Sequence, residues 1–438
     1  MSSSPKLSKE PFIINFIEPS RALATNEMEI KPRIQLPMKD SSRSTKLVSQ
    51  TKQLPRIELP LKESSRSIKL ASQIKLLPQI AKDLSSTSNI KIENCVGFTS
   101  VPVGLAGPLT LNGTYQDRKT LYAPLATVEP TLVAACSRGC KLFSACGGIS
   151  TAALDEGVAR APVFTFSTID QALAFYRLVP SLLGQFQMIA NRTSRHGSLV
   201  SVSPRIIGSS VHVKFTYTCG DAAGQNMVTL GTHAACMDLI SNDRPDGMIE
   251  FQLDGNVSSD KKLSWGSVQE PRGVSVLAWG TISNDISEEM LGCSTKRLKN
   301  VLSRFEEGGV RNGQMGQCLN PSNIVAAMFI ACGQDVASVL ESGFSHLTGE
   351  YNEETEVLTL SLFFPSLLVG SVGGGTGYGT QKEALEFIGC RGEGKKWALA
   401  ETIAAFALAL EISTLSALAT DTFASSHKDL ARGPKAKL

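Results

Sequence analysis

Residues 211–227 read V-H-V-K-F-T-Y-T-C-G-D-A-A-G-Q-N-M, and the order of residue types in this stretch indicates a strand, a turn and a helix start. Apolar and polar residues alternate over residues 211–218, which predicts a half-buried strand. A glycine-containing turn follows from Gly220, and a helical pattern begins at Met227. The free N–H groups of such a helix start can bind an anion, but an ordinary sharp turn has the same pattern. Both interpretations of the turn remain open at this point.

The composition of the whole chain limits the class of protein in which this strand–turn–helix unit occurs. The chain has 438 residues, of which 42% are hydrophobic and 19% charged, enough for two or three domains with buried cores. A net charge of +3 excludes the strongly basic surface of nucleic-acid binders. The ten cysteines form no CxxC pair and there are only five histidines, so we expect no metal site and reduced thiols in the cytoplasm. The final Ala436-Lys437-Leu438 is one residue from the peroxisomal SKL signal, which leaves a peroxisomal location as the alternative.

The first ninety residues differ from the rest in being rich in Ser, Lys and Pro. They contain a repeat with a period of 23 residues, in which Arg33–Pro37 returns as Arg56–Pro60. Two copies are too few for a solenoid. Residues 1–90 are therefore interpreted as a flexible arm with a duplication, with a partner-binding arm as the alternative.

Two helices are predicted with particular boundaries. Residues 131–146 have helical periodicity, and we expect Pro130 at the first helical position, where its missing N–H costs nothing. Residues 397–420 form the most apolar stretch of the chain. The presence of Glu401 and Glu411 within it favours a buried helix over a membrane span.

A third predicted helix contains an unusual carboxylate. It starts with Asn320 as N-cap and continues as far as Val339, with Asp335 on its apolar face. A carboxylate on a buried face is costly unless a cation pairs with it. The pair is either a structural salt bridge or a catalytic carboxylate beside a lysine, for which Lys261 and Lys262 are candidates.

Standard nucleotide-binding motifs do not account for the glycine-rich segments. The fingerprint GxGxxG does not occur. Residues 389–396 fit GxxxxGK, but Lys396 replaces the magnesium-binding Ser or Thr and the preceding segment indicates a helix, so a P-loop is disfavoured. A further glycine-dense turn lies at residues 370–377.

Several segments in fixed order resemble the signatures of class I hydroxymethylglutaryl-CoA reductases. They are residues 93–108 (E-N-C-V-G-F to V-P-V-G-L-A-G-P), 126–129, 137–141, 221–227, 255–262, 330–335 and 372–376. The resemblance covers about residues 91–432 and leaves out the N-terminal arm. Because it consists of several long motifs in order, the chain is similar to this family along most of its length.

The resemblance implies NADPH-dependent reduction of 3-hydroxy-3-methylglutaryl-CoA to mevalonate and CoA. Lys261 would stabilise the oxyanion that develops twice on one carbonyl oxygen, and Asp335 would hold this lysine. Glu129 would protonate the oxygen of the aldehyde or mevaldyl intermediate, and His427 would protonate the departing CoA thiolate. An acid that donates near pH 7 needs a raised pKa, and we expect burial of Glu129 to supply it.

The resemblance also implies two sets of binding residues. The cofactor set comprises Ser194, Arg195, Asp221, Gly224, Asn226, Met227, Gly373, Gly374 and Arg432. Within it, Ser194 and Arg195 match contacts to the 2′-phosphate that distinguishes NADPH from NADH. The substrate set comprises Asn94, Arg138, Arg160, Asp254, Asn256, Lys262 and Asn323. Arg160 matches a clamp for the free carboxylate of the substrate, and Asn323 matches a residue that supports the catalytic lysine.

Some positions depart from the family pattern. Pro130 follows the catalytic Glu where a glycine is usual, Asn320 replaces a histidine near CoA, and only Arg304 could substitute for a second carboxylate-binding lysine. Asp254 replaces a serine and would repel an anionic substrate. An active reductase therefore competes with a weakly active or non-catalytic, inhibitor-tolerant paralogue, and with an oxidoreductase for another acyl-CoA.

For the fold, the resemblance implies the α+β class. A large helical CoA-binding domain (residues 91–162 and 253–438) would carry an inserted small ferredoxin-like NADPH-binding domain (residues 163–252). It also implies a homodimer or tetramer with active sites shared between subunits. We expect no membrane span, because the sequence shows no segment of that kind.

Overall fold

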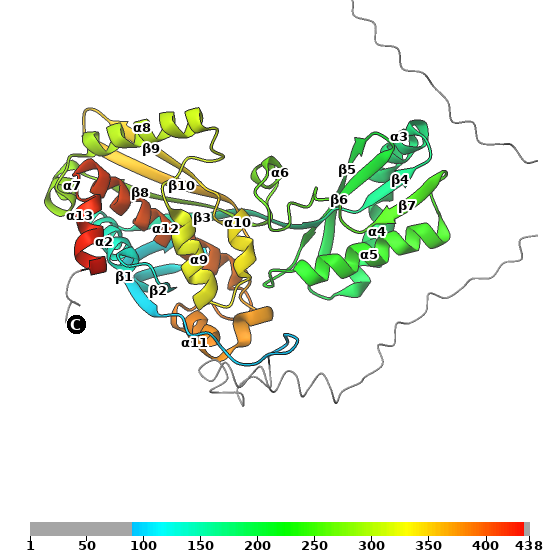
Figure 1. Ribbon diagram of the computed structural model, residues 1–438, viewed down its shortest axis with the longest axis horizontal. Coiled ribbons are helices and arrows are strands. Elements are labelled where there is room, and N and C mark those ends of the chain that lie inside the picture. The colour runs from blue at the N-terminus through cyan, green and yellow to red at the C-terminus, as the bar shows by residue number, and fades with distance from the viewer. Residues whose placement is uncertain (1–89, 433–438) are drawn as a thin grey trace, which may run out of the picture. The chain divides into compact units, whose positions relative to one another are not determined.

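The computed structural model of the chain describes residues 90–432. The predicted arm with its 23-residue repeat and the C-terminal Ala436-Lys437-Leu438 lie outside the described residues. Within residues 90–432 the structure mixes helices and strands (Figure 1), which confirms the α+β class.

Ten strands form one sheet in the described part of the chain. They are β1 (Val103–Gly113), β2 (Asp117–Ala126), β3 (Ile149–Arg160), β4 (Val163–Phe166), β5 (Ser198–Ile207), β6 (Ser210–Thr218), β7 (Met248–Gln252), β8 (Gly273–Ile282), β9 (His346–Asn352) and β10 (Val357–Leu367). The strand order is β7-β4-β6-β3-β8-β10-β9, while β1 pairs with β2 and β3, and β5 pairs with β6. The predicted strand at residues 211–218 is β6.

Twelve α-helices accompany the sheet in residues 90–432. They are α2 (Leu132–Ala145), α3 (Ile169–Leu178), α4 (Leu183–Ala190), α5 (Gln225–Asn242), α6 (Trp265–Gln269), α7 (Asn284–Leu291), α8 (Thr295–Asn312), α9 (Pro321–Ala331), α10 (Val339–Ser342), α11 (Gly379–Phe387), α12 (Lys396–Ala419) and α13 (Phe423–Arg432). Short 3-10 helices include Val336–Ser338 and Gly374–Gly377.

The segment from Val163 to Gln252 has the order β4-α3-α4-β5-β6-α5-β7. Its strands lie side by side as β5-β6-β4-β7, which is the antiparallel arrangement of a ferredoxin-like βαββαβ unit. The unit has a hydrophobic cluster of its own, in which Phe164, Phe186 and Phe215 are fully buried. Strand β6 also pairs with β3, so this unit and the rest of the chain share one sheet. We expected the rest of the chain to be a helical domain. It contains helices but also the strands β1–β3 and β8–β10.

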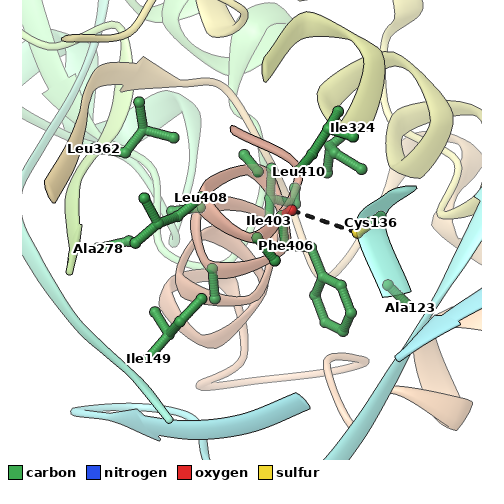
Figure 2. Packing of buried hydrophobic residues seen from close by; sticks show 14 of the residues in the cluster. Ala123, Cys136, Ile149, Ala278, Ile324, Leu362, Ile403, Phe406, Leu408 and Leu410 are labelled. Carbon is green, nitrogen blue, oxygen red and sulfur yellow. Dashed lines mark hydrogen bonds between the residues drawn. The ribbon is translucent and has the colours of Figure 1, made fainter. Parts of the chain in front are cut away.

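Helix α12 is the centre of the main core. It is apolar on all sides, as in helices that are surrounded by protein. Figure 2 shows Ile403, Phe406 and Leu410 of α12 among buried residues of neighbouring elements, including Cys136 of α2 and Ile324 of α9. By length and a mean hydropathy of 1.7 the helix could cross a membrane, but 83% of that window is buried inside the structure. The prediction of a buried helix is confirmed.

Helix α2 approaches α12 closely because of one glycine. A Cβ atom at Gly139 would lie 1.7 Å from the carbonyl oxygen of Ala409, so only glycine permits this backbone contact. The thiol of Cys136, one turn earlier, donates to the carbonyl of Phe406 (Figure 2). The sequence S-R-G-C-K at residues 137–141 thus fixes the distance between α2 and α12.

Two predicted helix boundaries were wrong. Helix α2 begins at Leu132, after Thr131 at φ 81°, so Pro130 precedes the helix rather than starting it. Helix α9 ends at Ala331, and Asp335 lies beyond it as the N-cap of the helix Val336–Ser338. The helix stops because Gly333 takes a left-handed φ of 68° and packs against the backbone of Gly375. Asp335 is therefore not on a buried helical face.

Both glutamates of α12 anchor loops. Glu401 accepts hydrogen bonds from the N–H groups of Thr114, Tyr115 and Gln116 in the β1–β2 turn. Glu411 accepts from the N–H groups of Leu319 and Asn320, 2.7 Å each, just before α9. Buried carboxylates are tolerated here because each satisfies backbone donors that would otherwise be unpaired.

We predict that Glu411 makes stability depend on pH. Burial raises the pKa of Glu411 to about 7, against the two hydrogen bonds that lower it. Because the pKa in the folded state lies above the unfolded value of about 4.3, the folded chain binds the proton more tightly between these values. The contribution to stability is fully present below pH 4 and falls as pH rises to 7, by up to about 4 kcal/mol.

Thermal unfolding midpoints of the parent and of Glu411→Gln between pH 5 and pH 8 would check this. The parent should lose more stability over this range than the variant, whatever the offset between them. Parallel curves for the two proteins would show that Glu411 does not titrate in this window.

Candidate active site

Lys261 and Asp335 form an ion pair, with 3.0 Å between Nζ and Oδ2. Asp335 also accepts from Nε2 of Gln225, 3.1 Å away, and from the N–H of Ala337. Partial burial by itself would raise the pKa of Asp335, but the hydrogen bonds from Lys261 and Gln225 outweigh it and lower the pKa. The pair is partly exposed, 42% for Lys261 and 38% for Asp335, so the ammonium group is fixed and still accessible.

The loop that presents Lys261 has an unusual backbone. Asn256, Ser259 and Lys261 all have positive φ, at 67°, 58° and 53°. Non-glycine residues rarely adopt this conformation, and clusters of it occur where function requires a fixed side-chain direction. Lys262 points elsewhere in this turn, and its ammonium donates to the carbonyl of Asp260, 2.9 Å away.

A chain of alternating charges lies behind this loop. Nη1 of Arg160 contacts Asp254 at 2.8 Å and Asp260 at 3.1 Å. Asp260 also pairs with Arg272, which is almost fully buried and approaches Glu341. Burial opposes ionisation of Asp260, but Arg272 and Arg160 outweigh it and lower the pKa of Asp260. Asp254, which we expected to repel an anionic substrate, is thus paired with Arg160 inside the chain.

Glu129 lies at a different place, in the loop between β2 and α2. Its Oε1 accepts a hydrogen bond from Nδ2 of Asn323, 3.2 Å away. The predicted partner of Asn323 was the lysine, so among the contacts of the described residues Asn323 supports the acid instead. Glu129 is exposed in the single chain. The burial that we expected around this carboxyl group is therefore not supplied by residues 90–432 alone.

A cavity of about 250 Å³ opens beside Glu129. Leu132, Ala135, Leu410 and Ala417 give it apolar walls, and Arg138, Asn320 and Thr414 are among its polar residues. Phe423 and Ser426 of α13 also line it, so α13 brings the position of His427 close to Glu129. The side chains of His427 and Arg432 lie outside what the structure describes.

Arg138 contributes to this cavity as a fixed cation. Its Nε donates to Oγ of Ser413 at 3.1 Å and its Nη2 to the carbonyl of Ser413 at 2.6 Å. Burial lowers the pKa of Arg138, with Cys293 acting in the opposite direction. Asn94, the other residue predicted near CoA, is exposed in the segment before β1, with a left-handed φ of 54°.

The two glycine-rich turns lie side by side. Ala222 and Val372 form a parallel bridge, and the N–H of Ser371 donates to the carbonyl of Asp221. Gly373 and Gly374 have positive φ, and a Cβ atom on either would meet nothing within 4 Å. Their turn is therefore open on one side. Gly224, at φ 80°, precedes α5 without any side-chain cap, which leaves the first N–H groups of α5 available to an anion.

The matching family is described as "Hydroxymethylglutaryl-coenzyme A reductase", and its profile matches residues 56–432. The 3-hydroxy-3-methylglutaryl-coenzyme A reductase of Halobacterium salinarum is 36% identical over 358 residues, covering 80% of this chain and 87% of the relative. The chain belongs to the hydroxymethylglutaryl-coenzyme A reductase family.

Other relatives agree. A 3-hydroxy-3-methylglutaryl-coenzyme A reductase 2 of Gossypium hirsutum is 36% identical over 78% of this chain and 55% of its own length. Among solved structures, the reductase of Streptococcus pneumoniae matches with a TM-score of 0.59 and 18% identity, over 81% of this chain and 97% of that one. That likeness supports the reductase fold only.

In this reductase the predicted 2′-phosphate residues lie beside α5. The space next to Gly197 is filled by Met227 near the start of α5, with Ser194 close by. Ser194 accepts the N–H of His196, and Arg195 is exposed. The sequence thus places Ser194, Arg195, Asn226 and Met227 within one region.

Asp221 has a packing role that we did not predict from the sequence. Its carboxylate accepts from the N–H groups of Gly394, Lys395 and Lys396, at 2.8 to 3.2 Å. These are donors at the N-terminus of α12, so Asp221 caps that helix from a distant loop. The carboxylate therefore holds the turn at residues 220–226 against α12.

Sequence reasoning missed Asp260, Gln225 and Arg272. Asp260 precedes Lys261 directly, and this adjacency was the one signal that could have identified it. Gln225 lies within the motif at residues 221–227 but was given no role, because its contact with Asp335 joins residues that are distant in sequence. Arg272 gave no signal.

We predict that Asp221→Ala destabilises the chain by about 1–2 kcal/mol, the usual loss for an N-cap. Asp221→Asn keeps one acceptor oxygen and should lose less. Unfolding midpoints in denaturant would measure both. If Asp221→Ala is as stable as the parent but binds NADPH poorly, the capping role is refuted.

Proposed function

We propose that this chain catalyses the NADPH-dependent reduction of hydroxymethylglutaryl-CoA to mevalonate and CoA. The observation that carries the proposal is the Lys261–Asp335 ion pair, which fixes an accessible cation next to Gln225 at the start of α5. Family membership and the reductase names of relatives at 34–37% identity support it.

The described residues fit NADPH. The uncapped start of α5 and the open Gly373–Gly374 turn offer room and N–H donors for phosphates, and Arg195 is exposed beside them. When bound, NADPH supplies the hydrides of both reduction steps. Arg195 and Ser194 would hold its 2′-phosphate, while Asn226 and Met227 would lie along it.

The protein residues then handle charge and protons. Each reduction places negative charge on the carbonyl oxygen of the acyl group, and Lys261 stabilises it from a fixed position. Asp335 keeps this ammonium oriented. Glu129 donates the proton to the oxygen, while His427 on α13 protonates the CoA thiolate that leaves after the first step.

We further infer that two chains share each active site. In the part of the chain that the structure describes, no ion pair joins Glu129 to Lys261. Asn323, which holds Glu129, lies in the first turn of α9, whereas Asp335 follows its last turn, and the eight residues between Asn323 and Ala331 rise about 12 Å. Because an acid must come within about 3 Å of the oxygen that it protonates, this separation along α9 supports a site that two chains share.

The surface around Glu129 supports this inference. Val128 is 83% exposed, and Val103, Leu105 and Tyr122 on the adjacent hairpin are also exposed. Contiguous apolar surface of this kind marks an interaction site. A second copy on this face would bury Glu129 and supply the environment that raises the pKa of a catalytic acid.

We also infer that the chain is a diverged member of class I with residues 163–252 as an NADPH-binding domain. The separate hydrophobic cluster of that segment supports the domain. The segments that resemble class I signatures support the class. Asp254, Pro130 and Asn320 support the divergence.

The reaction is tested by following NADPH consumption with hydroxymethylglutaryl-CoA and with mevaldehyde. Lys261→Ala should lose both reductions, by roughly a thousandfold or more, because both steps develop an oxyanion. Normal mevaldehyde reduction by this variant would refute the role of Lys261. A parent protein without activity on either substrate would refute the proposed function.

The sharing of sites is tested by complementation. Glu129→Gln and Lys261→Ala are each expected to be inactive alone. When the two variants are coexpressed with different affinity tags, some dimers contain one chain of each kind. In such a hybrid dimer, one of the two active sites should be intact. Random pairing then restores roughly a quarter of the parent activity. If purified hybrids remain inactive, the acid and the lysine of one site come from the same chain.

A further inference from the structure

Arg160 already has an almost complete set of partners inside the chain. Nη1 donates to both Asp254 and Asp260, and Nη2 donates to Oγ1 of Thr229 at 2.8 Å. The side chain is only 13% exposed, and its Nε is buried without a partner. Of the five N–H donors of a guanidinium group, one on Nη2 is left for a ligand on the accessible edge.

A carboxylate ligand gains most when it binds two N–H groups of the fork at once. The resident contacts prevent this, because both hydrogens of Nη1 are occupied. An incoming carboxylate would therefore bind through one hydrogen bond, or would first have to displace one of the two aspartates.

The two aspartates are not equally replaceable. Asp260 is also bound by the buried Arg272. If Asp260 moved away from Arg160, it would disrupt this buried charge network. Asp254 is 26% exposed and has two further partners, the N–H of Asn256 and the hydroxyl of Ser258, both at 2.8 Å. It can release Arg160 and keep these contacts.

We propose that Asp254 is a specificity-determining residue, an internal carboxylate that occupies Arg160 and competes with the free carboxylate of the acyl substrate. The inference rests on the proposed function for the role of Arg160 as the substrate clamp. According to this inference, Asp254 does not repel the substrate carboxylate but competes with it for the guanidinium group of Arg160. Dicarboxylic acyl ligands bind less tightly in consequence, whereas ligands without a carboxylate are unaffected by this pair.

The test compares the parent with Asp254→Asn, which removes the charge but retains an oxygen for the N–H of Asn256. Calorimetry with free 3-hydroxy-3-methylglutarate should show roughly tenfold tighter binding in the variant, the value of one recovered charge-assisted hydrogen bond. KM for hydroxymethylglutaryl-CoA should fall by a similar factor with kcat little changed. Asp246→Asn is the matched control, because it removes the charge of an exposed aspartate outside this cluster and should leave both constants unchanged.

A second background shows whether Arg160 is the route. In Arg160→Lys, which keeps the charge without the fork, the gain from Asp254→Asn should disappear. Unchanged or weaker binding by Asp254→Asn, or a full gain in the Arg160→Lys background, would overturn the proposal. Tighter binding without any turnover would uphold the inference while refuting the proposed function, and turnover without tighter binding would do the reverse.

Discussion

The structure depends on burying one apolar helix without leaving its polar groups unpaired. Helix α12 is surrounded by α2, α9 and the sheet, and the donors at its N-terminus are paired within the protein. Asp221 supplies the acceptor from a loop 175 residues earlier, and Lys396 is paired with Glu156 at 2.8 Å. That loop is also the candidate nucleotide turn. The contacts that complete the packing of α12 therefore also fix the position of this turn.

The other buried charges extend this logic. Glu401 and Glu411 tie the β1–β2 turn and the start of α9 to α12. Glu129, held by Asn323, and the cavity beside it are thus located by contacts of a helix that carries no catalytic residue. At the other part of the candidate site, Arg272 holds Asp260 and thereby the loop of Lys261, which has several positive φ angles. Rigidity at both places is what electrostatic catalysis needs, since preoriented charges require no reorganisation during the reaction.

Much of this could be predicted from the sequence where the signal is local. The alternation of residues 211–218 identified β6, and the uninterrupted apolar run of residues 397–420 identified α12. Asp335 was recognised as a carboxylate in need of a cation, and Lys261 was named for it. The reason given was wrong, since helical periodicity was extended past Gly333, where the backbone turns. The cap at Asp221 and the pairing of Asp254 with Arg160 could not be predicted, because each joins residues about a hundred or more positions apart through tertiary packing alone.

The separation of the acid from the lysine would give the proposed oligomer a chemical role. One chain provides a fixed ammonium group with a low-pKa partner at one end of α9 and an exposed carboxylic acid at the other. A carboxylic acid that donates a proton near neutral pH needs a raised pKa, which burial of the carboxyl group can supply. Assembly would therefore do two things at once, by bringing a lysine to the acid and by removing water from it. If two chains share each site as we propose, a free subunit would be inactive and hydride transfer would be limited to the assembled protein.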